Sequence, residues 1–93
     1  MKIVNPSVEL DIEKKVLINL NLGSGVYHKS NYYSLDHLPL EGVDILADLN
    51  ESLTLLPDNC VRKVFSHHVL EHVENFIPLM GELHRVVKND GVI

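Results

Sequence analysis

An apolar run that ends in a glycine turn constrains the fold of this chain more than any other feature. Residues 16–22 read Val-Leu-Ile-Asn-Leu-Asn-Leu and lead directly into Gly23-Ser24-Gly25. Such a run is typical of a buried strand, and the glycines allow a sharp turn and the close approach of a ligand. Asp36 follows the next apolar segment, 32–35, where an acid suits hydrogen bonding to two ribose hydroxyls. The pattern therefore predicts a cofactor that contains a nucleoside.

The spacing of these residues does not fit a dinucleotide. The dinucleotide fingerprint is Gly-x-Gly-x-x-Gly at the start of a helix, with its acid roughly 20 residues further on. Here His28 stands at the third glycine position, and Asp36 comes too early. Only residues 26–31 connect the turn to the next strand, whereas a parallel crossover usually takes about a dozen residues or more. We expect little helix in this connection and no pyrophosphate site, which favours a nucleoside cofactor without phosphates.

The remainder of the chain predicts a small α/β arrangement with one long helix. Helical spacing of the apolar residues predicts a helix from Asn75 to Val87, with Asn75 as N-cap and residues 89–91 ending it. The turn signal Pro57-Asp58-Asn59 places residues 50–59 in a loop. We expect strands at 16–22, 32–35, 43–47 and 61–66.

The first fifteen residues carry a different pattern. Val8, Leu10 and Ile12 alternate with acidic residues, and this alternation indicates a half-buried strand. A short helix is the alternative interpretation.

Five segments follow one another along most of the chain in an informative order: Asn21 to Gly25, Asp36, Val43 to Leu49, Phe65 to Val73, and Glu82 to Gly91. This ordered set resembles the class I S-adenosylmethionine-dependent methyltransferases, and more narrowly their small bacterial and archaeal branch with a short first crossover. The resemblance implies a single S-adenosylmethionine-binding domain over residues 1–93 with a Rossmann-like α/β sheet. We expect that sheet to be incomplete, with about four parallel strands and without the C-terminal strands of the family fold.

By the same resemblance, the glycine turn would pass beneath the methionine part of the cofactor. This assigns Asn21, Gly23, Ser24 and Gly25 to cofactor binding. Asn21 stands where the family usually has an acid, so a hydrogen bond would replace a charge contact to the amino group of the cofactor.

Four further residues are assigned to the cofactor by the resemblance. Asp36 would accept hydrogen bonds from both ribose hydroxyls, and a solvated loop acid or Asx turn is its alternative role. Asp48 would accept from the exocyclic amine of adenine while Leu49 packs on the ring, although Asp48 could equally serve to cap a loop. Ser66 ends the strand that, in the family, faces the transferred methyl group.

The residues after Ser66 are the candidates for catalysis. Methyl transfer is an in-line displacement, so most acceleration comes from positioning, and a base helps when the acceptor is a hydroxyl. Histidine suits that role near neutral pH, which makes His68 the first candidate and His67 the second. The alternative is that these polar residues only shape the loop.

The same region matches a metal motif. His68-Val69-Leu70-Glu71-His72 has the H-x-x-E-H pattern of inverted zinc proteases, which would make the protein a zinc hydrolase. The motif begins at a strand end rather than within a helix, and no third ligand cluster follows. We therefore expect no metal site.

Composition limits the remaining possibilities. With 13 acidic and 8 basic residues the formal charge is −5, which disfavours nucleic acid as a partner. No apolar run approaches the roughly 18 residues of a membrane span, and the N-terminus lacks a signal-peptide core. A single cysteine, Cys60, is compatible with the cytoplasm.

These observations predict an enzyme that transfers a methyl group from S-adenosylmethionine to a small-molecule or glycan acceptor. A non-catalytic binding module that retains only the cofactor half is the main alternative. We also expect a homodimer, because the strand 61–66 would have an uncovered edge if residues 92–93 alone lay beside it.

Overall fold

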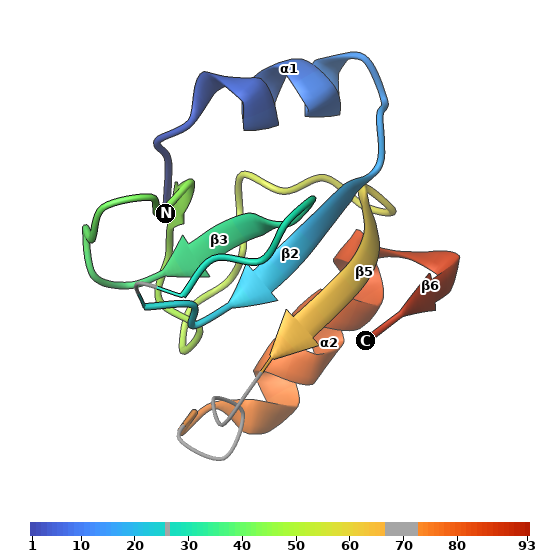
Figure 1. The fold of residues 1–93 in the computed structure, drawn as a ribbon. Helices are drawn as coiled ribbons and strands as arrows, with labels where there is room; N and C mark the ends of the chain where they lie inside the picture. The colour runs from blue at the N-terminus through green and yellow to red at the C-terminus, as the bar shows by residue number, and fades with distance from the viewer. Residues whose placement is uncertain (26, 67–72) are drawn as a thin grey trace.

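A computed structural model describes residues 1–25, 27–66 and 73–93 of the chain (Figure 1). In chain order, its elements are β1 (Lys2–Ile3), α1 (Pro6–Glu13), β2 (Ile18–Leu22), β3 (Tyr33–Asp36), β4 (Ile45–Leu46), β5 (Val61–Ser66), α2 (Phe76–Val86) and β6 (Val87–Val92). Neither α1 nor α2, nor any other helix in these ranges, is long and apolar enough to cross a membrane.

Within the described ranges the strands form one sheet with the order β1-β4-β3-β2-β5-β6. Every neighbouring pair is parallel except β1 and β4, which are antiparallel. The carboxyl ends of β2, β3, β4 and β5 therefore meet at one edge of the sheet, where ligands of open α/β sheets bind. The predicted Rossmann-like α/β fold class is confirmed, although the strand count differs from the expected four.

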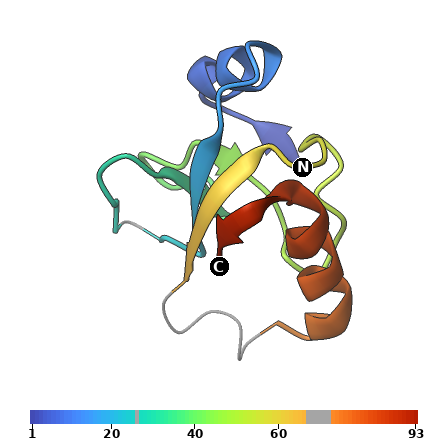
Figure 2. The same ribbon diagram turned by 90° about the vertical axis from the view of Figure 1, so that its right-hand side faces the viewer.

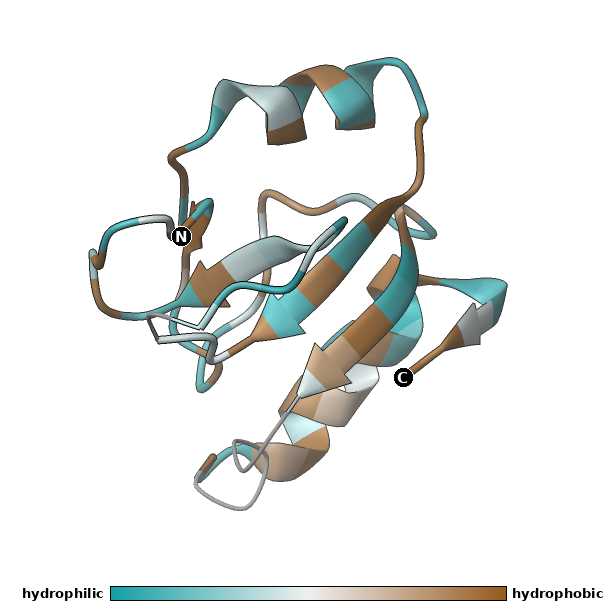
Figure 3. Ribbon diagram, in the orientation of Figure 1, coloured by the Kyte–Doolittle hydropathy of each residue, from teal (hydrophilic) through white to brown (hydrophobic). Residues whose placement is uncertain are grey.

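The two faces of the sheet have different characters. Figure 3 shows hydrophobic and hydrophilic residues alternating along β2, as expected for successive side chains on opposite faces. Ile18, Leu20 and Leu22 are buried in the core with Leu79 and Leu83 of α2. Figure 2 shows the sheet from its side, with α2 on one face and the connection from β2 to β3 on the other. The face opposite α2 is thus available for polar groups and a ligand.

The N-terminal segment corrects one prediction. Residues 6–13 form the helix α1, which was the alternative interpretation, and not the half-buried strand that the alternation indicated. The side chain of Asn5 accepts a hydrogen bond from the Ser7 N–H, and Pro6 occupies the first turn, where its missing N–H costs little. Val8 is fully buried while Leu10 is half exposed, so the alternation did not predict which side chains are buried.

The C-terminal segment corrects a second prediction. The helix ends at Val86, and residues 87–92 form β6, which pairs with β5 at Val61↔Val87 and Lys63↔Val92. The Asn89-Asp90-Gly91 sequence therefore lies within a strand, and the interpretation of these residues as a helix stop was wrong. Because β6 covers part of β5, the uncovered edge from which we predicted a homodimer does not exist in the expected form.

Arg85 of α2 fastens the loop before β5 to the helix. Its guanidinium donates to the carbonyl oxygens of Leu53 and Leu56 at 3.0 and 2.8 Å and to the Asp58 carboxylate at 2.9 Å. It also donates through Nε to Glu82 at 2.8 Å, and Glu82 in turn accepts from the Leu53 N–H at 2.8 Å. The Arg85 side chain therefore holds the predicted loop, residues 50–59, against α2.

Acidification is expected to weaken this attachment. The hydrogen bond from Arg85 holds the pKa of Glu82 below its ordinary value. A lowered pKa in the folded state means that the stabilisation is complete above the unfolded pKa and is lost as the pH falls through the folded pKa. Urea unfolding followed from about pH 6 to about pH 3 should show a loss of stability below about pH 4.3 that Glu82→Gln makes shallower. Glu41→Gln, at an exposed glutamate, is the control. If it made the pH dependence of stability equally shallow, Glu82 would not be the group responsible.

Candidate functional site

The glycine turn after β2 adopts the backbone conformation that its sequence predicts. Gly23 and Gly25 have φ angles of 59° and 56°, in the left-handed region that glycine adopts without steric cost. The Gly23 N–H donates to the Leu35 carbonyl of β3 at 2.7 Å, which fixes the start of the turn. A Cβ built on Gly25 would meet open space, so the turn borders a cavity.

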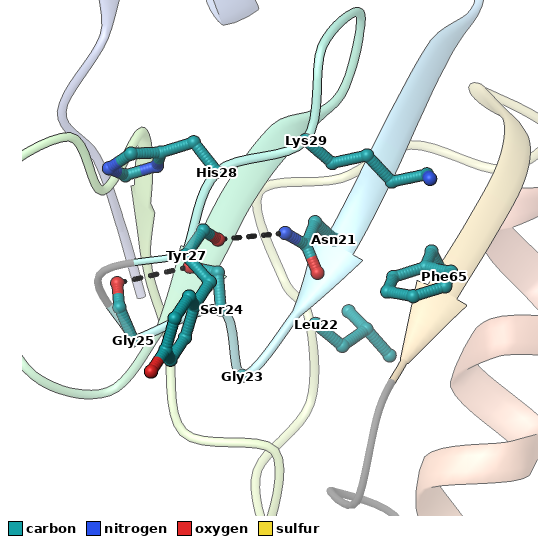
Figure 4. A pocket seen from close by; sticks show the side chains of 9 residues that line it. All are labelled: Asn21, Leu22, Gly23, Ser24, Gly25, Tyr27, His28, Lys29 and Phe65. Carbon is teal, nitrogen blue, oxygen red and sulfur yellow. Dashed lines mark hydrogen bonds between the residues drawn. The ribbon is translucent and has the colours of Figure 1, made fainter.

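That cavity has a volume of about 530 Å³ and lies at the carboxyl end of β2 (Figure 4). It falls within the range of small-molecule sites, about 300–1,000 Å³. The residues that line it come from β2, the turn, the connection to β3 and β5: Asn21, Leu22, Gly23, Ser24, Gly25, Tyr27, His28, Lys29 and Phe65. We call it the glycine-turn pocket. The four residues assigned to the methionine part of the cofactor all line it.

Asn21 holds the connection over the sheet. Its side-chain Nδ2 donates to the Tyr27 carbonyl at 3.2 Å, and the Tyr27 N–H donates to the Ser24 carbonyl at 2.9 Å. Figure 4 shows the Asn21 nitrogen directed toward Tyr27 and its oxygen on the opposite side. A carboxylate could not donate this bond. The amide therefore suits a short crossover that has little helix to support it.

Lys29 lies across the aromatic side of the pocket. Its Nζ is 4.7 Å from the centroid of the Phe65 ring and 5.4 Å from that of Tyr32, within the range of cation–π attraction. The two rings meet edge to face with centroids 6.5 Å apart. Five of the lining residues were not assigned to the cofactor from the sequence: Leu22, Tyr27, His28, Lys29 and Phe65. The β2–β5 register pairs Phe65 with Asn21, and no pattern in residues 61–66 indicated this position.

Asp36 holds the glycine turn in this structure. It ends β3 and is 6% exposed. Its carboxylate accepts from the Gly25 N–H at 2.8 Å and from the Leu38 N–H at 3.0 Å, and His37 Nδ1 lies 3.3 Å away. The bond to Leu38 is the Asx turn considered as an alternative, whereas the bond to Gly25 was not foreseen. The Asp36 carboxylate thus links the end of β3 to the glycine turn.

Asp48 borders a second hollow of about 350 Å³ at the same edge of the sheet. His37 and Ala47 also line this hollow, whereas Asp36 lines neither this hollow nor the glycine-turn pocket. Asp48 is exposed, and its Oδ1 accepts from the Asn50 N–H at 2.8 Å, which is the loop-capping role considered above. Leu49 is partly buried against the core. The structure places this pair apart from the glycine-turn pocket.

The residues proposed for catalysis are only partly described. Ser66 ends β5, is half-buried and pairs in register with Leu22, which puts it beside the glycine turn. His67 and His68 lie outside the described residues, as do Glu71 and His72 of the H-x-x-E-H motif. Across the part of the chain that the structure describes, no three His, Cys, Asp or Glu residues cluster so that they could hold a metal ion.

The groups with shifted pKa values in the described ranges lie outside the pocket. Burial raises the pKa of Cys60 to about 11, so this thiol is protonated near neutral pH and is a poor nucleophile. Burial and a hydrogen bond to Asp11 raise the pKa of Tyr33 to about 12. Nothing in these two sites suggests nucleophilic catalysis.

The family model described as a methyltransferase domain matches residues 8–93. The match begins within α1 and includes the glycine turn, Asp36, the carboxyl ends of β4 and β5, and β6. No curated protein and no solved structure matches the chain.

Proposed function

The chain belongs to the methyltransferase domain family, and from this premise we propose that it uses S-adenosylmethionine as its methyl donor. The observation that carries the proposal is the turn Gly23-Ser24-Gly25, which borders a pocket of about 530 Å³ at the carboxyl edge of the sheet. A turn without large side chains lets a ligand approach the backbone closely.

The residues at this edge suit the parts of such a cofactor. Asp36 is the candidate for the ribose: each carboxylate oxygen has a second lone pair, so it can accept a hydroxyl while it keeps its backbone partner. The glycine turn is the candidate for the amino-acid end. Asp48 and Leu49 are the candidates for adenine, with Oδ2 of Asp48 as the acceptor because Oδ1 serves Asn50.

The cofactor would supply a methyl group on a sulfonium centre, and the protein would position the acceptor in line with it. Ser66 lies at the end of β5 nearest this position. His68, or His67 in its place, would remove the proton from an acceptor hydroxyl. We propose a small molecule or a glycan as the acceptor. The net charge of −5 disfavours a nucleic acid or another polyanion in this role.

The homodimer and the cytoplasmic location remain predictions. The dimer no longer has the open β5 edge as its basis, because β6 pairs with β5. Sedimentation at micromolar concentration would test it, and a stable monomer would contradict it.

Titration calorimetry tests the cofactor assignment directly. We expect S-adenosylmethionine and its demethylated product, S-adenosylhomocysteine, to bind with one site per chain and to raise the melting temperature. NAD is the control ligand, since the turn lacks the third glycine of the dinucleotide fingerprint, and it should give no heat. Folded protein that responds to neither adenosyl ligand would show that the assignment is wrong.

A further inference from the structure

The charge in the glycine-turn pocket is opposite to the charge that the resemblance leads one to expect. Among the described residues that line it, Lys29 carries a permanent charge and none is an Asp or a Glu. Asn21 occupies the position where the family usually has an acid. The pocket therefore offers a cation, where a site built around an acid would offer an anion.

We propose that Lys29 pairs with the carboxylate of the cofactor's amino-acid end, so that the pocket selects adenosyl ligands that carry this carboxylate. The inference rests on the proposed function and assigns a specificity-determining residue within it. Figure 4 shows the Lys29 side chain extending toward Phe65, with Asn21 between it and the glycine turn. Lys29 and the glycine turn line the same pocket, so an amino-acid end bound in this pocket would share it with the ammonium group.

The aromatic rings give Lys29 a defined position before any ligand binds. A free lysine loses considerable side-chain entropy when it forms an ion pair. Here the faces of Phe65 and Tyr32 already attract the ammonium group, at 4.7 and 5.4 Å from the two centroids. Less conformational freedom is then lost on binding, which favours the pair.

The amino group of the cofactor has a weaker partner. An ammonium group needs an acceptor, and the amide of Asn21 can offer only its oxygen, which is neutral, because its Nδ2 is a donor and already bonds the Tyr27 carbonyl. A hydrogen bond from the ammonium group to the Asn21 oxygen has one charged partner, whereas the pair of Lys29 with the carboxylate has two opposite charges and gains their Coulomb attraction as well. Affinity should therefore depend more on the carboxylate than on the amino group, the reverse of a site with an acid at position 21.

The test compares S-adenosylmethionine with its decarboxylated form, two ligands that differ only in the carboxylate. We expect the wild-type chain to bind S-adenosylmethionine about tenfold more tightly, by calorimetry at low ionic strength. The net charge of −5 attracts the more cationic decarboxylated ligand, so this preference cannot come from long-range attraction. Added salt should reduce the preference.

Variants test whether Lys29 causes the preference for the ligand with the carboxylate. Lys29→Met should bring the two affinities within about twofold of each other, whereas Lys29→Arg should keep most of the difference. Phe65→Leu, which removes one ring beneath the ammonium group, should reduce the difference partway. Lys14→Met at the end of α1 makes the same change in net charge outside the pocket and should leave the preference intact.

The outcomes separate this inference from the proposed function. If the wild-type chain binds both ligands equally, or if Lys29→Met keeps the tenfold preference, the role of Lys29 is overturned while cofactor binding stands. If neither ligand binds the folded wild-type chain, both proposals are overturned. Lys29 is exposed, so its variants should keep the thermal unfolding profile of the wild type.

Discussion

Replacement of Arg85 by methionine is expected to lower the free energy of unfolding by about 2–4 kcal/mol, because several charge-assisted hydrogen bonds are lost together. The guanidinium donates to Leu53, Leu56, Asp58 and Glu82, and three of these residues belong to the loop before β5. Methionine retains the aliphatic volume but leaves the two carbonyl oxygens and the Glu82 carboxylate without this donor. For a domain of 93 residues, this loss is a large share of the total stability.

Urea denaturation and thermal unfolding measure this effect, with an expected fall in melting temperature of roughly 10–25 °C. Arg62→Met is the matched control, because Arg62 is exposed on β5 and should change stability by less than about 0.5 kcal/mol. Arg85→Lys should recover only part of the loss, since an ammonium group cannot donate in the planar geometry of a guanidinium. Equal effects of Arg85→Met and Arg62→Met would show that the network contributes little.

The strands β2 and β5 were predictable from the sequence, because each contains buried apolar residues between recognisable boundaries. The prediction for β5 agrees with the structure at both ends, and β2 was placed within two residues. In both strands apolar side chains face one core, and a glycine turn or a turn signal marks a boundary. The left-handed conformation of Gly23 and Gly25 was also implicit, because a sharp turn at a strand end favours residues without a Cβ.

The elements that depend on tertiary partners were not predictable in the same way. The β6 sequence Val-Lys-Asn-Asp-Gly-Val contains helix-ending residues, yet it pairs with β5 through backbone groups that every sequence has. In α1, the Asn5 cap and Pro6 were readable signals, but the alternation of apolar and acidic residues indicated a strand over the same positions. In β6 the local pattern and the tertiary context disagreed, and strand pairing prevailed. In α1 two local patterns disagreed, and the helix-start signals prevailed over the alternation.

The candidate site shows the same division. The sequence places Gly23, Gly25 and Asp36 at the carboxyl edge of the sheet because each follows a strand, and the structure agrees. The contributions of Lys29 and Phe65 depend on how the β2–β3 connection folds back over β5, which the spacing of the motif does not encode. The attachment of the turn to Asp36 likewise required the geometry of both strands.

Asp36→Ala is expected to weaken the binding of S-adenosylhomocysteine by about 1–3 kcal/mol, five- to 150-fold, since the ribose hydroxyls lose their acceptor. The same change removes the acceptor of the Gly25 and Leu38 N–H groups. The glycine turn should therefore loosen, and the free energy of unfolding should fall by about 1–2 kcal/mol. Asp90→Ala, at an exposed carboxylate on β6, is the control for the loss of one negative charge.

A second ligand separates the two functions of Asp36. 5′-Methylthioadenosine contains the ribose but lacks the amino-acid end, so Asp36→Ala should weaken it as much as S-adenosylhomocysteine. Lys29→Met should weaken only the ligand that has the carboxylate. Unchanged affinity for both ligands in a destabilised Asp36→Ala chain would mean that this residue holds the glycine turn and does not contact the ribose. Asp36→Asn keeps one carbonyl oxygen, which can accept one of the two backbone N–H groups, and should recover part of the stability but less of the binding.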